Sequence, residues 1–153
     1  ALRTKSVDAI WIFYAWAGVK TELEGLETDY FAFADLDSVF DFYTPVIIAN
    51  NTFLAEEPET ARAFLDAVSR GYEFAIEHPQ EAGEILCKAA PELDPDLVKA
   101  SQEYLADKYQ TDAPQWGYID QERWDAYYAW LNEKGLTETP IEAGTGCSNE
   151  YLP

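Results

Sequence analysis

The chain has 153 residues and carries 10 Lys and Arg against 29 Asp and Glu, a formal net charge of -19. This length and a hydrophobic content of 48% are typical of one globular domain, not of a disordered chain. The acidic charge repels phosphate backbones, so we expect no nucleic-acid partner. No apolar run approaches the roughly 20 residues that a membrane-spanning helix needs.

The first third of the chain predicts a strand, a helix and further strands. Residues 7–13 are apolar on both faces, as in a buried parallel strand. A helix is expected over 15–25, and a second strand over 29–34. Residues 42–50 are again rich in β-branched side chains. Pro45 removes a ladder donor from that segment, which favours an edge, a bend or a crossover.

Helices are predicted from Pro58 onward, because proline suits the first helical position. The pair His78-Pro79 ends the first of these helices and begins another. The apolar face of the first helix, taken at helical spacing, consists of Ala61, Phe64, Leu65, Val68, Tyr72 and Ile76.

Two more helices have clear start signals. Asp94-Pro95 is an N-cap followed by proline and predicts a helix to about residue 106. Asp120 caps a last helix, which Gly135 stops. The inner face of that helix is expected to carry Trp124, Tyr127, Tyr128 and Leu131.

The residues that catalysis usually needs are sparse. His78 is the only histidine, and its place before a proline at a helix junction indicates a solvent-facing turn. No phosphate-binding glycine loop, GxSxG or HExxH motif occurs. Cys87 and Cys147 lack metal-ligand spacing, and whether they form a disulfide stays open. We therefore expect a protein that is not an enzyme, with no metal and no cofactor.

The densest chemical signal is the run Trp11-Ile12-Phe13-Tyr14-Ala15-Trp16, with Trp11, Phe13, Tyr14 and Trp16 as candidate ligand-binding residues. It lies where a strand's carboxyl end meets a helix, the place where open α/β sheets bind ligands. Such rings can sandwich a planar heterocycle, and free N–H groups of residues 14–17 can receive an oxygen. The alternative is plain core packing, and we expect one or two of the rings to be buried.

A second candidate site is the stretch that leads into Pro45. If Pro45 marks a crossover between two lobes, Tyr43 and Thr44 lie beside the cleft that the lobes form. The alternative, equally weighted from the residues alone, is a tyrosine packed under a loop.

Several stretches in order are similar to one known family. They are VDA at 7–9 leading into FYAWAG at 13–18, YTPVIIA at 43–49, PE at 58–59, GYEFAIEHP at 71–79 and NEYLP at 149–153. Together they resemble the thiamine-pyrimidine-precursor-binding branch of the solute-binding proteins of ABC importers, and specifically its C-terminal half.

This resemblance implies an α/β protein with the two-lobed type 2 periplasmic-binding fold, here a few parallel strands followed by a mostly helical region. Residues 1–41 would end the second lobe, 42–50 would cross back, and 51–153 would complete the first lobe. The N-terminal half, with its signal peptide or lipid anchor, would be missing. Helices made to cover an absent sheet expose apolar faces, which predicts self-association or an unseen partner segment.

The resemblance also implies a function outside the cytoplasmic membrane, the capture of a small heterocyclic solute for a permease subunit. Relatives that bind aminopyrimidines typically have Glu at the position of Ala17 and Tyr at that of Phe13. A methyl group accepts no hydrogen bond, so a flat, less polar ligand fits better. The alternatives are a riboflavin, sulfonate or nitrate-type ligand, an enzyme of the same fold in thiamine pyrimidine synthesis, and a purely helical interaction domain.

Overall fold

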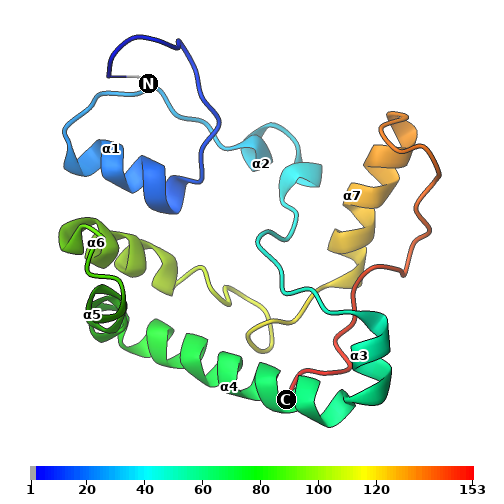
Figure 1. Cartoon of the computed structure of the whole chain (residues 1–153). Coiled ribbons are helices and arrows are strands. Elements are labelled where there is room, and N and C mark those ends of the chain that lie inside the picture. The colour runs from blue at the N-terminus through cyan, green and yellow to red at the C-terminus, as the bar shows by residue number, and fades with distance from the viewer. Residues whose placement is uncertain (1–2) are drawn as a thin grey trace. The chain divides into compact units, whose positions relative to one another are not determined.

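The computed structural model describes residues 3–153, which form helices joined by loops (Figure 1). The chain divides into two compact units. One contains the residues up to Asp29 together with Arg70–Asp112, and the other contains Tyr30–Ser69 with Ala113–Pro153. In chain order the elements are η1 (Tyr14–Gly18), α1 (Val19–Leu23), α2 (Phe33–Leu36), η2 (Ser38–Phe40), α3 (Asn51–Glu56), α4 (Pro58–Glu77), α5 (Pro79–Ala89), α6 (Pro95–Ala106) and α7 (Gln121–Glu133).

None of the three predicted strands forms within residues 3–153. Residues 9–13 are irregular, 33–36 turn into α2, and 42–50 run without regular structure and bend at Pro45, after a cis peptide bond. A strand gains its backbone hydrogen bonds from a neighbouring strand, and no other described segment pairs with any of these three. Apolar side chains of these segments therefore face solvent, and Ile48 is 88% exposed.

The first unit is built on the pair of helices α5 and α6, which lie side by side in Figure 1. The α6 helix begins as expected, with the Asp94 carboxylate accepting from the Asp96 N–H at 3.0 Å. Leu97 and Val98 are buried on α6, and η1 and α1 pack against the same helix. Val19, in α1, is also buried. Contact between these helices supplies the core of the unit.

The helix predicted over 15–25 is confirmed, and it begins one residue earlier as a π-helical turn, η1. The Tyr14 ring lies back over Gly18, where a Cβ would stand 2.5 Å from a ring carbon. Only glycine permits that approach. The chain leaves α1 through Gly25, whose φ of +63° is typical of a helix stop.

In the second unit, half-buried aromatic rings pack along α7. Trp130 and Tyr127 stack with centroids 6.0 Å apart, and Tyr127 stacks on Phe42 at 4.5 Å. Phe40 meets Trp130 edge-on at 5.2 Å. Tyr43 and Trp124 stack as a separate pair, with centroids 6.4 Å apart. We call these two groups of rings together the aromatic column, and its members are Phe40, Phe42, Tyr43, Trp124, Tyr127 and Trp130. The column attaches the irregular segment 40–43 to a regular helix.

The tail after α7 is held by hydrogen bonds between side chains and backbone groups. The Asn132 amide donates to the Ile141 carbonyl at 2.8 Å, and its oxygen accepts from the Ile141 N–H at 2.9 Å. Asn149 forms the same two-way contact with Ile119, at 2.8 and 2.9 Å. The Trp124 indole N–H donates to the Thr145 carbonyl at 3.1 Å. The bonds to Ile141 and Thr145 satisfy backbone groups of the tail, and the bonds to Ile119 connect the tail to the segment before α7.

The predicted apolar face of α4 needs one correction. Ala61 is buried as expected, but Phe64 is 56% exposed. On the same helix, Arg62 lies over the Tyr151 ring at 5.3 Å and donates to the Glu150 carbonyl. No helix within residues 3–153 has both the length and the apolar character needed to cross a bilayer.

We predict that Gly83 sets the spacing of α5 and α6. A Cβ at Gly83 would meet Val98 Cγ1 at 3.6 Å, so alanine fits and the further carbons of leucine do not. Gly83→Leu should lower the free energy of unfolding by about 1–3 kcal/mol. Gly71→Leu, on α4 with no atom within 4 Å of the added Cβ, should instead be neutral or stabilising. Urea unfolding of both variants tests this, and equal stabilities would contradict it.

Asn132→Ala should release the tail. The substitution leaves the N–H and carbonyl of Ile141 unpaired and costs about 1–3 kcal/mol. Hydrogen exchange at the Ile141 amide should accelerate, and the tail should become sensitive to protease. Asn51→Ala, at the exposed start of α3, is the control. Unchanged exchange at Ile141 would show that the tail is held by other contacts.

The thiol of Cys147 is expected to lose its proton at a higher pH than an ordinary cysteine does. Burial raises its pKa above the usual value and the Asp125 charge acts the same way, while the hydrogen bond to Gln121 opposes them. A raised folded-state pKa stabilises the fold below the unfolded pKa, and this contribution is lost as pH rises through the folded value. In a Cys87→Ala background, iodoacetamide alkylation should therefore reach half its maximal rate at higher pH in the folded chain than in urea. Equal midpoints would refute this.

Candidate functional site

The first candidate site is the aromatic junction, which we define as Trp11, Phe13, Tyr14 and Trp16. Trp11 is 62% and Phe13 54% exposed, and their centroids are 4.8 Å apart with the planes at 64°. Trp16, in η1, is also exposed. Three of the four predicted rings therefore present apolar faces to solvent next to the start of a helix.

Tyr14 behaves differently from the other three rings. Its ring packs over Gly18 and lies 5.2 Å from the Tyr104 ring of α6, and its hydroxyl donates to Glu22. These contacts give Tyr14 an internal packing role, which is the core alternative considered for this run.

The expected free backbone donors are only partly available. The N–H groups of Trp16 and Ala17 both bond the Phe13 carbonyl, at 3.2 and 3.0 Å. A ligand oxygen at this helix start would therefore compete with an internal bond. The junction is better suited to stacking than to binding an anion.

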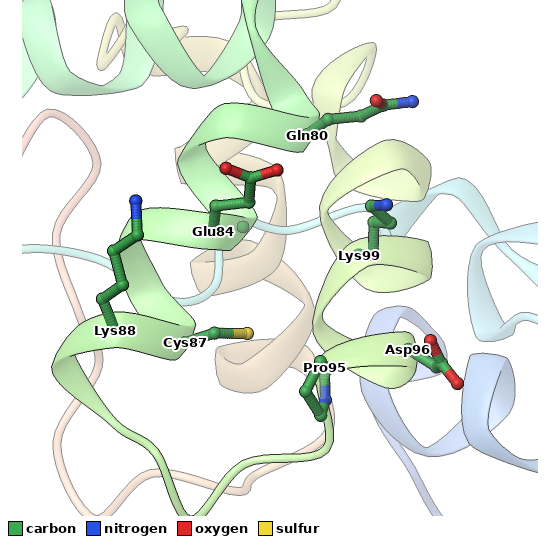
Figure 2. Close-up of a pocket in the computed structure, with 8 residues that line it drawn as sticks. Gln80, Glu84, Cys87, Lys88, Pro95, Asp96 and Lys99 are labelled. Carbon is green, nitrogen blue, oxygen red and sulfur yellow. The ribbon is translucent and has the colours of Figure 1, made fainter.

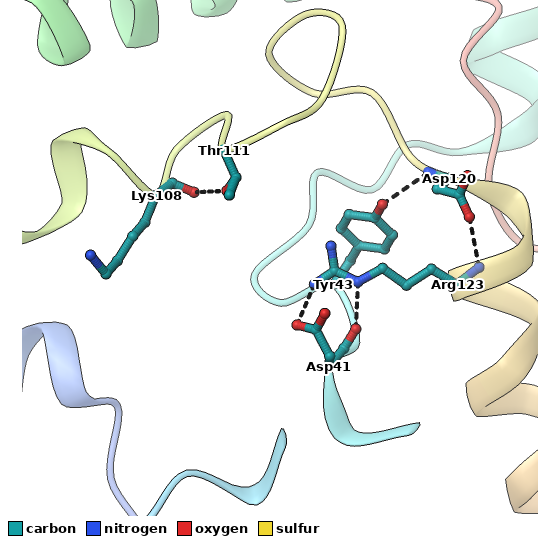
Figure 3. A network of polar contacts seen from close by, with 6 residues as sticks. All are labelled: Asp41, Tyr43, Lys108, Thr111, Asp120 and Arg123. Atoms are coloured by element: carbon teal, nitrogen blue, oxygen red, sulfur yellow. Dashed lines mark hydrogen bonds and ion pairs between the residues drawn. The ribbon is translucent and has the colours of Figure 1, made fainter. Parts of the chain in front are cut away.

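The second candidate site surrounds Tyr43, and Figure 3 shows its polar contacts. We call Asp41, Tyr43, Asp120, Arg123 and Trp124 the Tyr43 clamp. The Arg123 guanidinium lies 4.2 Å from the centre of the Tyr43 ring. It also holds Asp41 twice, through Nη2 to the carboxylate at 2.6 Å and through Nε to the backbone carbonyl.

The other end of the Tyr43 side chain is held at the start of α7. Its hydroxyl oxygen accepts from the Asp120 N–H at 2.9 Å, while the Asp120 carboxylate caps the Arg123 N–H at 2.8 Å (Figure 3). Trp124 stacks with the Tyr43 ring at 6.4 Å. Helix-terminal N–H groups are thus satisfied by the residues that orient the phenol. Thr44 is exposed and forms no hydrogen bond with any residue from 3 to 153.

Arg123 is a residue that the sequence analysis missed. Its partner Asp41 lies 82 positions earlier in the chain, so no local pattern connects them. One signal was available. A cation in the first turn of a helix opposes the helix dipole, which indicates that a carboxylate from elsewhere compensates it.

A surface hollow of about 380 Å³ lies between α5 and α6 (Figure 2). Its charged groups are the cations Lys88 and Lys99 and the carboxylates Glu84 and Asp96, and the Cys87 sulfur points between the helices. No aromatic ring lines it. The balanced charges and missing rings make it a poor match for a flat heterocycle.

Metal-ligating side chains do not gather in the described part of the chain. Within residues 3–153 no group of three or more His, Cys, Asp or Glu is placed to hold an ion. Cys87 and Cys147 are both free and half-buried. The chemistry of the described residues is that of aromatic faces and of the polar clamp around Tyr43.

Comparison with characterised proteins gives three relatives. The chain is 29% identical over 124 residues to the formylaminopyrimidine-binding protein of Halalkalibacterium halodurans, and 24% identical over 140 residues to the riboflavin-binding protein RibY of Chloroflexus aurantiacus. It is also 36% identical over 116 residues to the 4-amino-5-hydroxymethyl-2-methylpyrimidine phosphate synthase of Candida albicans. The alignments cover 78%, 85% and 72% of this chain but only 37%, 38% and 31% of the relatives.

A family model covers the aromatic junction, the Tyr43 segment and the long helix α4. It is described as NMT1/THI5 like and matches residues 1–82, more than half of the 153 residues. This agrees with the resemblance seen in the ordered sequence stretches and with two relatives that are named as binding proteins. The chain belongs to the NMT1/THI5-like family.

Proposed function

We propose that this chain is part of a solute-binding protein that captures a small, flat heterocycle outside the cytoplasmic membrane and delivers it to the permease of an ABC importer. The observation that carries the proposal is the aromatic junction, where Trp11, Phe13 and Trp16 leave apolar rings exposed at a helix start. Each ring stacked on a ligand contributes about 0.5–1.5 kcal/mol beyond the area it buries.

The relatives support a heterocyclic ligand and narrow its chemistry. One is named for a formylaminopyrimidine and one for riboflavin, and both names denote flat ring systems. Ala17, half-buried in η1, offers no acceptor to an amino group. Phe13 carries no hydroxyl group that could form a hydrogen bond with a ligand. We therefore favour a ligand recognised by stacking, such as a flavin, over an aminopyrimidine.

We also propose that the whole protein has the two-lobed type 2 periplasmic-binding fold. In it, residues 1–41 end one lobe, 42–50 cross between lobes, and 51–153 complete the other. The exposed, uncharged segment 46–48 supports the crossover, because its backbone forms no backbone hydrogen bond within the described residues and its side chains suit a sheet.

The second candidate function is an enzyme of thiamine pyrimidine synthesis. The observation that favours it is the relative named as a pyrimidine phosphate synthase. The chain has a single histidine, His78, which is exposed at the junction of α4 and α5. We rank the enzyme function below solute binding. Formation of product by the purified protein, supplied with iron, would reverse this ranking.

The binding proposal predicts ligand-dependent stability. The protein, expressed from its whole gene, should be heated with riboflavin and with 4-amino-5-hydroxymethyl-2-methylpyrimidine. A ligand present at 100 times its Kd adds about 2.7 kcal/mol of stability. Trp11→Ala and Trp16→Ala should weaken the binding of that ligand by about fivefold, because each removes a stacking face.

The matched control for these variants is Phe64→Ala, which removes an exposed ring outside the junction. It should leave the Kd unchanged. Absence of a thermal shift with either compound would overturn the heterocycle proposal. Equal weakening by all three substitutions would show that the junction has no special role.

A further inference from the structure

We propose that Tyr14 is a positioning residue for the exposed rings of the aromatic junction. Held by Glu22 and Gly18, it keeps the rings of Phe13 and Trp16 in place before a ligand stacks on them. It acts through these neighbours and does not touch the ligand itself. This inference rests on the proposed function and gives Tyr14 a task different from that of the other three rings.

Phe13 and Trp16 stand on a helix start that is too short to be stable alone. Phe13 is the N-cap of η1, and its carbonyl accepts from the N–H groups of Trp16 and Ala17 at 3.2 and 3.0 Å. Because isolated helices shorter than about 12 residues are marginal in water, η1 and α1, of 5 residues each, need tertiary contacts. The π turn of η1 is also a rare element, found frequently at functional sites.

Tyr14 supplies such contacts in three directions. Its hydroxyl donates to the Glu22 carboxylate on α1, and its ring lies 5.2 Å from the Tyr104 ring on α6. The same ring lies over Gly18, which is buried. All of these residues and the three exposed rings belong to one compact unit. Rings that are held in advance lose less entropy when a ligand binds, so their stacking contributes more to affinity.

Gly18 leaves the space that the Tyr14 ring fills. A Cβ on Gly18 would stand 2.5, 2.7 and 2.8 Å from three carbons of that ring, where non-bonded carbon atoms prefer roughly 3.5–4.0 Å. Alanine in place of glycine otherwise favours a helix. Gly18→Ala therefore opposes two effects, a better helix former and a displaced tyrosine ring, and weaker ligand binding would show that the ring matters more.

Tyr109 provides a matched control within the same compact unit. Its hydroxyl donates to the Gln102 side-chain oxygen at 3.2 Å, and its ring meets the Tyr72 ring edge-on at 4.9 Å. Tyr109→Phe removes the same kind of hydrogen bond as Tyr14→Phe, but from a place outside the junction. The two variants together separate the placement of the junction rings from a general loss of stability.

The experiment measures the Kd of the protein, expressed from its whole gene, for riboflavin and for 4-amino-5-hydroxymethyl-2-methylpyrimidine by titration calorimetry. Tyr14→Phe, Glu22→Ala and Gly18→Ala should each weaken binding about threefold, because the ligand must then order the rings itself. Glu22→Gln should bind nearly as the wild type does, since its amide oxygen still accepts from the phenol. Tyr109→Phe should leave the Kd unchanged.

A double-mutant cycle tests whether Glu22 acts through Tyr14. In a Tyr14→Phe background, Glu22→Ala should weaken binding no further, because both substitutions remove one hydrogen bond. A full additional weakening would overturn the inference, as would equal weakening by Tyr14→Phe and Tyr109→Phe. Normal binding by Tyr14→Phe with weak binding by Trp16→Ala would overturn it and leave the heterocycle proposal standing. A wild-type protein that binds neither compound would overturn both.

Discussion

Packing of the irregular segment 40–43 against the aromatic face of α7 is the interaction on which the second unit depends. That segment has no strand partner and only a single 3-10 turn, η2, of its own. Ring contacts of 4.5–6.4 Å therefore replace the hydrogen bonds of a ladder. At about 0.5–1.5 kcal/mol for each pair beyond buried area, the column is sufficient to hold a short loop against a helix. Its last member, Tyr43, thereby acquires a defined orientation.

The charged side chains of this molecule have two different roles. Most of the 29 carboxylates serve as a solvated exterior, but a few cap helices or meet one of the 10 cations. Asp41 and Arg123 belong to this second class, although their pair is exposed and weak. Its importance is geometric, because it connects a loop to the first turn of α7 and covers the face of a tyrosine.

The two candidate surfaces differ in the chemistry that they expose. The aromatic junction presents exposed faces, which suit stacking and tolerate many flat rings. The Tyr43 clamp instead holds one phenol in place, through the Asp120 N–H on its oxygen and the Arg123 guanidinium over its ring. Exposed aromatic faces agree with a family whose named members include binders of different heterocycles.

Sequence alone determined the helix after residue 14, the helices from Pro58 onward and the aromatic candidates, but it missed α2 and α3. The starts at Pro58, Asp94 and Asp120 were predicted correctly, because caps and proline act within a few residues of where they stand. Tertiary structure decided the rest. The predicted strands did not form because a strand needs a partner that local pattern cannot supply, and Tyr14 turned inward because Gly18 admits its ring. The role of Arg123 emerged only when folding brought together residues 82 positions apart.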